Sequence, residues 1–467
     1  MVAGSVLGSG AVFLEGSVVN VALPAIARDF HVGIIGLQWV INAYLLTLSA
    51  LMLLGGALGD RFGRPRVFAI GCVGFAIASF GCALAPDMKL LVLLRAVQGA
   101  AGALLVPNSL AMLDTAFAGE ERGAAIGQWA AWSAVSTAAG PFAGGWLVDT
   151  LSWRWVFSAV IVFALAAALI VMRHIASGSV KPAAQSVKGE RIDYLGAALG
   201  TIALAGLVGA LMAGPALGFS DWRVLAAGIG GITCLAGFVF VERHVSHAIL
   251  PLSIFRSRQF SGVNAATFLV YAALSGLFFL LMPQLQSNLH YSALRAGAAL
   301  TPANVIMLVV SPIAGRASAR IGPRVLMTVG ALIAAAGMVL FARVQPGVSY
   351  LGTILPATIV FGFGLSLLVA PLTSAVLSAV KESDTGIASG INNAVARLAG
   401  LISTAALPLA AGLGGSAKAE GAAYAAGYAR AMLISAGLCA AGAVVALVTV
   451  RNEHPTRRAT NASGERE

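Results

Sequence analysis

A single carboxylate lies in the middle of a long apolar stretch near the start of the chain. Glu15 stands within the run from Val2 to Ala27. That run is long enough to cross a bilayer, because about 20 helical residues span a hydrocarbon core of roughly 30 Å. A charge at this depth costs at least ~2.5 kcal/mol, so such residues usually face a protein interior or a water-filled cavity and have a function. We therefore expect Glu15 to bind and release a proton.

Arg95 is the cation that we expect to pair with Glu15. It lies about two turns inside its own apolar segment, Leu90–Leu113, at a depth from which an arginine side chain can reach Glu15. Pairing would lower the cost of burying both charges and couple protonation of Glu15 to the position of the helix that carries Arg95. If two states of the protein expose Glu15 differently to water and to Arg95, their proton affinities differ. The alternative is a permanent structural pair.

The elements that carry these residues are membrane-spanning helices. Only 10% of the 467 residues are charged and 59% are hydrophobic, with a mean hydropathy of +0.90, whereas soluble domains have about 25% charged residues. Fourteen apolar segments, among them Ser5–Ala27, Ala124–Val148, Ala293–Ala314 and Tyr424–Val450, predict an all-α polytopic membrane protein with fourteen transmembrane helices.

The basic residues lie mainly on one side of this predicted topology. With the N-terminus inside, 19 of the 29 Lys and Arg fall on the inner side and 8 on the outer side, which leaves Arg95 and Arg397 within the membrane. This satisfies the positive-inside rule with both termini cytoplasmic. It also explains the net charge of +11 without a nucleic-acid partner. We predict a multi-pass protein of the cell inner (cytoplasmic) membrane.

The longest polar interruption, Arg173 to Asp193, follows the sixth predicted helix and suggests a 6+2+6 arrangement. The predicted domains are an N-terminal six-helix bundle (1–175), cytoplasmic linkers with two inserted helices (176–255), a C-terminal six-helix bundle (256–452) and a cytoplasmic tail (453–467). GALGDRFGRPR at Gly56–Arg66 recurs in degraded form as GRASARIGPR at Gly315–Arg324. This repeat indicates two pseudo-symmetric bundles, a frequent architecture of secondary transporters.

Two further motifs have a physical interpretation. In the loop after the second helix, Asp60 can meet cations or a helix N-terminus and so latch one conformation. The loop motif comprises Gly56, Asp60, Arg61, Gly63 and Arg64. The alternative is a basic loop that only sets topology. In the fifth predicted helix, small residues permit close packing beside a bent backbone. These residues are Gly140, Pro141, Gly144 and Gly145.

Several motifs in chain order resemble those of the major facilitator superfamily. GALGDRFGRPR is similar to its cytoplasmic loop signature, LLRAVQGAAGALLVP (Leu93–Pro107) to its fourth-helix arginine motif, and AAGPFAGG (Ala138–Gly145) to the fifth-helix antiporter motif. With VVNVALP, WRWVF (Trp153–Phe157) and fourteen predicted helices, the chain resembles the fourteen-helix drug:proton antiporter family, which includes multidrug exporters. That family usually has aspartate where this chain has Glu15. The resemblance implies a conformational role for the fifth-helix glycines.

Polar and aromatic residues at similar depth are candidates for a substrate cavity, although many such residues serve only as interhelical contacts. The candidates are Glu15, Asn20, Trp39, Tyr44, Gln98, Trp132, Tyr271, Asn304, Asn392, Asn393 and Arg397. The loop residues Trp153, Trp155 and Trp222 are expected to be interface anchors.

The resemblance implies a secondary active transporter, not an enzyme, that exports lipophilic drugs or antibiotic-like small molecules in exchange for protons. Its expected partners are a small lipophilic substrate, protons and the lipid bilayer, and it is expected to function as a monomer. The sequence has neither a GxxxxGK[ST] phosphate loop nor metal-ligand spacing, so we expect no cofactor and no metal. A facilitator or importer of a small organic solute on the same fold is an alternative, because fold does not determine direction. A membrane receptor or enzyme is disfavoured for lack of a nucleophile constellation.

Overall fold

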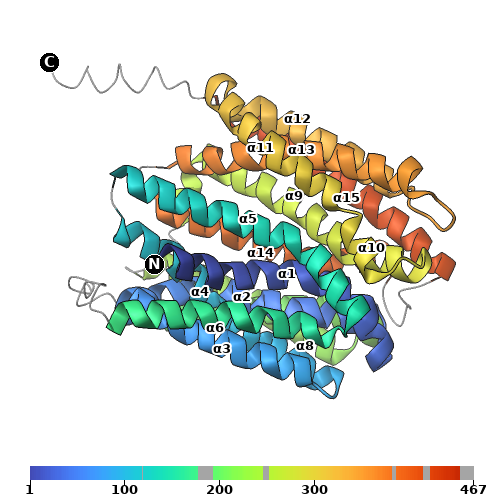
Figure 1. Ribbon diagram of the computed structural model, residues 1–467, viewed down its shortest axis with the longest axis horizontal. Helices are drawn as coiled ribbons and strands as arrows, with labels where there is room; N and C mark the ends of the chain where they lie inside the picture. The colour runs from blue at the N-terminus through green and yellow to red at the C-terminus, as the bar shows by residue number, and fades with distance from the viewer. Residues whose placement is uncertain (118, 177–192, 246–251, 381–384, 414–420, 453–467) are drawn as a thin grey trace. The chain divides into compact units, whose positions relative to one another are not determined.

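A computed structural model describes residues 1–117, 119–176, 193–245, 252–380, 385–413 and 421–452 (Figure 1). Within these residues every regular element is helical, and thirteen helices are long and apolar enough to cross a membrane. The protein is therefore an all-α polytopic membrane protein. The fourteen-helix count and the 6+2+6 layout stay predictions. Most of the predicted linker sequence before Asp193 and the tail 453–467 lie outside the described residues.

Eight helices cover the first half of the chain. They are α1 (Val2–Phe30), α2 (Ile34–Phe62), α3 (Arg64–Leu84), α4 (Met88–Ala116), α5 (Gly119–Thr150), α6 (Arg154–Ala176), α7 (Tyr194–Leu217) and α8 (Trp222–His244). Helix α5 corresponds to the predicted segment Ala124–Val148 but is not among the thirteen candidate spans. Its alanines alternate with Gly, Ser, Thr and Gln, so its hydropathy is low although its length of 32 residues suffices to cross a bilayer.

The second half has ten helical elements among its described residues. They are η1 (Leu252–Arg256), α9 (Arg258–Pro283), η2 (Gln284–Asn288), α10 (Ala293–Ala298), α11 (Thr301–Ile321), α12 (Pro323–Phe341), η3 (Tyr350–Ile354), α13 (Leu355–Ser378), α14 (Thr385–Ala410) and α15 (Gly421–Thr449). The sequence predicted one continuous helix over Ala293–Ala314, but the structure breaks it between α10 and α11. Pro302 explains the break. It has no N–H to donate within a helix, and its ring would clash with the carbonyl group four residues before it.

The described residues fall into two compact units. Unit 1 comprises Met1–Pro251, Phe278–Ala298 and Gly400–Tyr428, and unit 2 comprises Leu252–Leu277, Ala299–Ala399 and Ala429–Glu467. Helices α9, α14 and α15 have one end in each unit. The predicted domain boundaries differ from this division and stay a prediction.

In unit 1, α1 packs against α5 and α6, α2 against α4, and α3 against α4 and α6 (Figure 1). The core of these helices contains Phe68 and Phe75, both with no exposed surface. Ile70, Ile77 and Leu84, spaced by seven residues on α3, are instead 63–68% exposed. An apolar stripe of this kind faces lipid in a membrane helix.

The inserted pair α7 and α8 packs together and, through α7, against α2. The two helices approach closely at Gly206 and Gly231, where a Cβ on Gly206 would lie 2.6 Å from the Ala227 carbonyl oxygen. Asn42 of α2 lies 3.3 Å from the Met212 sulfur of α7. The inserted pair therefore packs against α2.

The two copies of the loop motif have the same backbone turn. Gly63 between α2 and α3 has φ +94°, and Gly322 between α11 and α12 has φ +84°. Only glycine adopts this region without strain. In each copy a proline then occupies the first turn of the next helix, where its missing N–H is tolerated. The agreement supports the interpretation of the halves as repeats.

Candidate functional site

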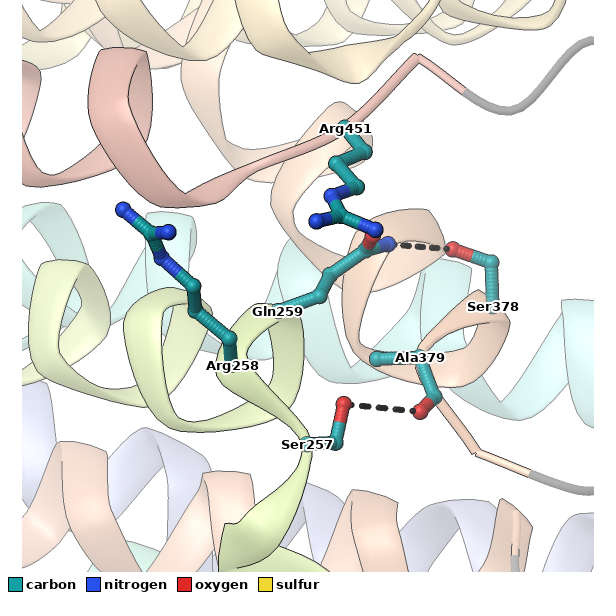
Figure 2. A pocket seen from close by; sticks show the side chains of 6 residues that line it. All are labelled: Ser257, Arg258, Gln259, Ser378, Ala379 and Arg451. Carbon is teal, nitrogen blue, oxygen red and sulfur yellow. Dashed lines mark hydrogen bonds between the residues drawn. The ribbon is translucent and has the colours of Figure 1, made fainter.

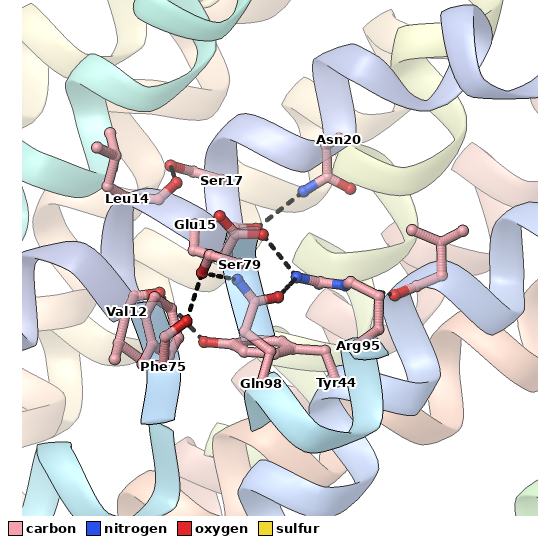
Figure 3. A network of polar contacts seen from close by, with 12 residues as sticks. Val12, Leu14, Glu15, Ser17, Asn20, Tyr44, Phe75, Ser79, Arg95 and Gln98 are labelled. Carbon is pink, nitrogen blue, oxygen red and sulfur yellow. Dashed lines mark hydrogen bonds and ion pairs between the residues drawn. The ribbon is translucent and has the colours of Figure 1, made fainter. Parts of the chain in front are cut away.

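Glu15 lies on α1 with no exposed surface and forms an ion pair with Arg95 of α4 (Figure 3). The Arg95 Nη1 and Glu15 Oε1 atoms are 2.6 Å apart, and the Arg95 side chain is 1% exposed. The pairing predicted from depth alone is therefore present. Because both charges are fully buried, removing either partner would leave an uncompensated charge.

Arg95 is held by more than its carboxylate. Its Nε donates to the Val40 carbonyl oxygen of α2 at 2.9 Å, and its Nη1 also donates to Gln98 Oε1 at 2.5 Å. The guanidinium carbon lies 4.3 Å from the ring centroid of Tyr44 and 5.7 Å from that of Phe157. These contacts offset the desolvation of the arginine and fix the guanidinium plane.

A chain of hydrogen bonds continues from Gln98 into α3. Gln98 Nε2 donates to Ser79 Oγ at 2.7 Å, and Ser79 Oγ donates to the Phe75 carbonyl oxygen at 2.7 Å. Tyr44 Oη donates to the Val12 carbonyl oxygen at 3.4 Å. The charge pair thus connects α1, α2, α3 and α4. Ser79 was missed from the sequence, because an isolated serine in an apolar helix gives no signal of its partner.

The second oxygen of Glu15 differs from the first. Glu15 Oε2 is buried and has no hydrogen-bond partner among the described residues. A carboxylate with one paired and one unpaired oxygen can take up a proton at the unpaired oxygen without displacing the guanidinium from the other. The geometry is therefore compatible with proton binding while Arg95 stays in place.

The neighbouring turn of α1 faces open space. Gly16 is exposed, and a Cβ built there would meet no atom within 4 Å among the described residues. Asn20, one turn further, is half-buried and donates to the Gly16 carbonyl oxygen at 3.1 Å (Figure 3). Glu15 thus lies one residue behind an open polar patch formed by Gly16 and Asn20. Of these two, only Asn20 was among the predicted cavity residues.

This patch gives a first testable prediction. Replacing Gly16 by leucine adds volume where no atom is near, so folding is expected to be unaffected, whereas transport of bulky substrates falls at least severalfold if the patch lines their path. The measurement compares the initial export rate with the amount of folded protein in the membrane. Gly230 on α8 also has no atom within 4 Å of a built Cβ, so Gly230→Leu is the matched control. Equal rates for Gly16→Leu and wild type would exclude the patch from the path.

The fifth-helix motif packs against α1 and α10. A Cβ on Gly140 would overlap Ser17 Oγ, and one on Gly144 would lie 2.5 Å from a methyl carbon of Val18. On its other side a Cβ on Gly145 would lie 2.5 Å from the Ala293 carbonyl oxygen. The glycines are therefore needed for close approach on two faces of α5.

Helix α10 is fixed to the end of α5 by a carboxylate. Asp149 Oδ1 accepts a hydrogen bond from the Ala293 amide at 2.9 Å, and its Oδ2 accepts one from the Leu294 amide at 2.8 Å. One turn along α10, Gly297 lies so close to α5 that a Cβ would overlap the Pro141 carbonyl oxygen. Asp149 thus acts as a cap for a helix that is remote in sequence. Nothing in the sequence connects these positions.

Two more side chains link helices from the two halves of the sequence. Like Asp149, they lie toward the side of the membrane that the sequence predicts to be outside. Gln286 Nε2 donates to the Val21 carbonyl oxygen of α1 at 2.9 Å. Gln38 Nε2 of α2 donates to the Thr404 carbonyl oxygen of α14 at 2.8 Å. All these contacts lie within unit 1. We call this group of contacts the outer gate: Asp149 with α10, Gln286 with Val21, and Gln38 with Thr404.

The predicted interface anchors divide into two groups. Trp153 is 4% exposed and donates to Asp29 Oδ2 at 3.0 Å, so its prediction as an interface anchor was wrong. A buried indole requires a hydrogen-bond acceptor, which Asp29 supplies while also pairing with Arg154 at 2.7 Å. Trp155 and Trp222 are 52% and 71% exposed, as anchors would be.

The loop motif forms a local ion pair. Arg64 Nε lies 2.8 Å from Asp60 Oδ1, with both side chains partly exposed, and Arg64 Nη1 donates to the Ala111 carbonyl oxygen of α4 at 3.0 Å. Gly59 abuts Asn108 so closely that a Cβ would overlap the Asn108 amide. A Cβ on Gly56 would lie at van der Waals distance from Pro107, so this glycine is not needed for close packing. Arg61 is exposed.

This geometry gives a second prediction. An exposed pair four residues apart contributes only about 0.3–0.5 kcal/mol, so Asp60→Asn is expected to lower the melting temperature by no more than a few degrees. A loss of transport much larger than this loss of stability would mean that Asp60 acts in another state, as a latch does. Arg122→Gln, which removes a comparable exposed pair with Asp114, is the control. Unchanged transport in both variants would support the topogenic alternative.

The remaining predicted cavity residues are divided between unit 1 and unit 2. In unit 1, Tyr44 and Gln98 surround Arg95, Trp39 is half-buried on α2, and Trp132 is 56% exposed on α5. In unit 2, Asn392 of α14 donates to Asn264 Oδ1 and Thr267 Oγ1 of α9 at 3.1 and 2.9 Å. It is therefore an interhelical contact.

The other predicted cavity residues of unit 2 lie on helices α9, α11 and α14. Tyr271 lies on α9 and Arg397 on α14. Asn304 is half-buried on α11, and Asn393 is exposed and donates to the Ser389 carbonyl oxygen. None of these residues belongs to the Glu15 network as the described contacts define it.

A bundle of membrane-spanning helices with a buried ion pair and repeated halves is typical of membrane transport proteins. The Major Facilitator Superfamily model matches residues 6–192 and 175–404. The chain therefore belongs to the major facilitator superfamily, as the sequence motifs predicted.

Three of the relatives are resistance proteins by name. The puromycin resistance protein pur8 of Streptomyces alboniger is 36% identical over 85% of this chain and 78% of that protein. The tetracenomycin C resistance and export protein of Streptomyces glaucescens is 31% identical over 85% and 72%. The methylenomycin A resistance protein of Streptomyces coelicolor is 30% identical over 84% and 82%.

Solved structures agree on the fold. A bacterial homolog of the human lysosomal transporter Spinster is 14% identical, with a TM-score of 0.67 over 96% of each chain. The xylose transporter XylE from E. coli is 15% identical, with a TM-score of 0.64 over 97% of this chain and 96% of XylE. The all-α fold of the superfamily is thereby confirmed.

Proposed function

We propose that this protein is a proton-coupled secondary transporter that exports lipophilic drugs or antibiotic-like small molecules by alternating access. The observation that carries the proposal is the Glu15–Arg95 pair, which has no exposed surface on its carboxylate and one unpaired carboxylate oxygen. A group of this kind can bind a proton in one state and release it in another when the helices around it move. The similarity to antibiotic resistance proteins supports export and the substrate class.

The outer gate supports alternating access. Asp149, Gln286 and Gln38 join helices from the two halves of the sequence at the predicted outer end. Each of these contacts is a polar bond to backbone, which can be broken and re-formed at modest cost because water replaces it. We interpret the described arrangement as a state that is closed on the outside, in which the substrate site is open to the cytoplasm. Both termini of the chain then lie in the cytoplasm.

The proton gradient can provide the energy. A difference of one pH unit is equivalent to about 1.4 kcal/mol, and ~100 mV to about 2.3 kcal/mol per charge. One proton per cycle can therefore support roughly several-hundred-fold accumulation of a neutral solute. With one deep acid and two deep arginines, we favour neutral or mixed lipophilic substrates over dications. We also propose that the monomer is the functional unit.

The test uses everted vesicles from a pump-deficient host. Addition of substrate to energised vesicles is expected to release protons from the lumen only when the chain is present, and the Glu15→Gln variant is expected to abolish this release. Substrate movement down its gradient without proton release would favour the alternative, a facilitator or importer.

A further inference from the structure

A polar pocket lies where helices of unit 2 end, on the side that the sequence predicts to be cytoplasmic. It has a volume of about 180 Å³ and is lined by Ser257, Arg258, Gln259, Ser378, Ala379 and Arg451 (Figure 2). These residues come from the start of α9, the end of α13 and the segment directly after α15. The pocket belongs neither to the Glu15 network nor to the outer gate.

The floor of the pocket is a fixed polar frame between α9 and α13. Ser257 Oγ donates to the Ala379 carbonyl oxygen at 3.3 Å and accepts a hydrogen bond from the Phe260 amide at 3.2 Å. Gln259, which is 8% exposed, lies with its Nε2 3.4 Å from Ser378 Oγ. The first-turn amides of the 26-residue helix α9 lie here and give the floor a partial positive charge.

Two arginines stand above this floor. Figure 2 shows Arg258 rising from the first turn of α9 and Arg451 reaching down toward Gln259 from the segment after α15. Both side chains are exposed, and neither has an ion-pair partner among the described residues. Two guanidinium groups beside the Gln259 amide and a helix N-terminus match a phosphate group, which accepts several charge-assisted hydrogen bonds.

The described charges of unit 2 favour an anion at this end. Its described residues contain no aspartate or glutamate, whereas six arginines lie at this end of its helices. These are Arg256, Arg258, Arg316, Arg320, Arg324 and Arg451. Glu382, Asp384 and Glu453 are close in sequence but lie outside the described residues.

The position of the pocket indicates the source of the anion. The ends of membrane-spanning helices lie at the level of the lipid head groups, and basic pockets between helices on the cytoplasmic side bind anionic head groups. We propose that this pocket binds a phosphate group, supplied by an anionic phospholipid of the surrounding bilayer. This inference is independent of the transported substrate, so it can fail or succeed without the proposed function.

The test measures retained lipid on the purified full chain. Mixed micelles containing phosphatidylglycerol or phosphatidylcholine are the probes, and native mass spectrometry counts the lipids that remain bound. The pocket variant is Arg258→Gln with Arg451→Gln. The matched control is Arg316→Gln with Arg320→Gln, which removes the same charge from exposed positions at the same end. We expect wild type and control to retain one phosphatidylglycerol molecule, and the pocket variant to bind it at least about tenfold more weakly.

Three results would overturn or redirect the proposal. Equal loss in the pocket and control variants would mean unspecific attraction to a basic surface, and loss in neither would exclude the pocket. If millimolar inorganic phosphate raises the melting temperature of wild type but not of the pocket variant, and no phosphatidylglycerol is retained, the phosphate site stands and the lipid source is wrong. Arg451→Gln alone, which lies beyond the last helix, provides the same readout if the double variant is poorly produced.

Discussion

Replacing Glu15 by glutamine is expected to abolish export against a gradient and to reduce antibiotic resistance to the level of the host. Glutamine has nearly the shape of a protonated glutamate, but it cannot release a proton. The transporter should therefore still fold and bind substrate while losing its coupling. Initial export rates, proton release from vesicles and the melting temperature of the purified variant together measure this result.

The partner variant separates a functional pair from a structural one. Arg95→Gln leaves the fully buried Glu15 without its cation, and breaking one side of a buried pair costs about 3–5 kcal/mol. The double variant Glu15→Gln with Arg95→Gln removes both charges and is expected to recover most of that stability but none of the transport. Glu121→Gln, on the exposed start of α5, is the control. If Glu15→Gln exported normally with unchanged proton coupling, the assignment of Glu15 would be wrong.

Replacing Gly145 by valine is expected to have the second largest effect. A Cβ at this position would lie 2.5 Å from the Ala293 carbonyl oxygen, and backbone atoms cannot move aside as a flexible side chain can. The outer gate could then not close around α10. We expect at least a tenfold loss of transport with normal insertion into the membrane, because the rest of α5 is unchanged.

Gly127 provides the matched control for this prediction. It lies on the same helix, and a Cβ there would meet no atom within 4 Å among the described residues. Gly127→Val should therefore transport normally, although both variants lower helix flexibility equally. Cysteine cross-linking between α5 and α10 should be efficient in wild type and weak in Gly145→Val. Equal transport by the two variants would mean that α5 and α10 need not pack closely during the cycle.

The charge pair could be predicted from the depth of its two residues in the membrane. Glu15 and Arg95 were paired from the sequence because buried charges are costly and few, and depth along a helix follows from the rise per residue. The surroundings of the pair could not be predicted in the same way. Val40, Ser79 and Phe157 contact Arg95 or Gln98 only because α2, α3 and α6 lie at particular angles around α4.

The fifth-helix motif shows the limit of local patterns. The spacing of Gly140 and Gly144 predicted close helix packing, but it did not identify the helix. The structure places α1 on one side and α10 on the other. Asp149 gave no sequence signal at all, because a carboxylate at the end of a helix is usually solvated, and its partners are 144 and 145 residues away.

The sequence by itself determined the membrane-spanning all-α class, the superfamily and the buried charges Glu15 and Arg95, because hydropathy, charge at depth and short motifs are local properties. The tertiary structure decided which helices meet. It broke the predicted helix over Ala293–Ala314 at Pro302, buried Trp153 against Asp29, and brought Arg258 and Arg451 to one pocket. These features depend on contacts between residues far apart in the chain, and such contacts are set by the packing of whole helices rather than by any one segment.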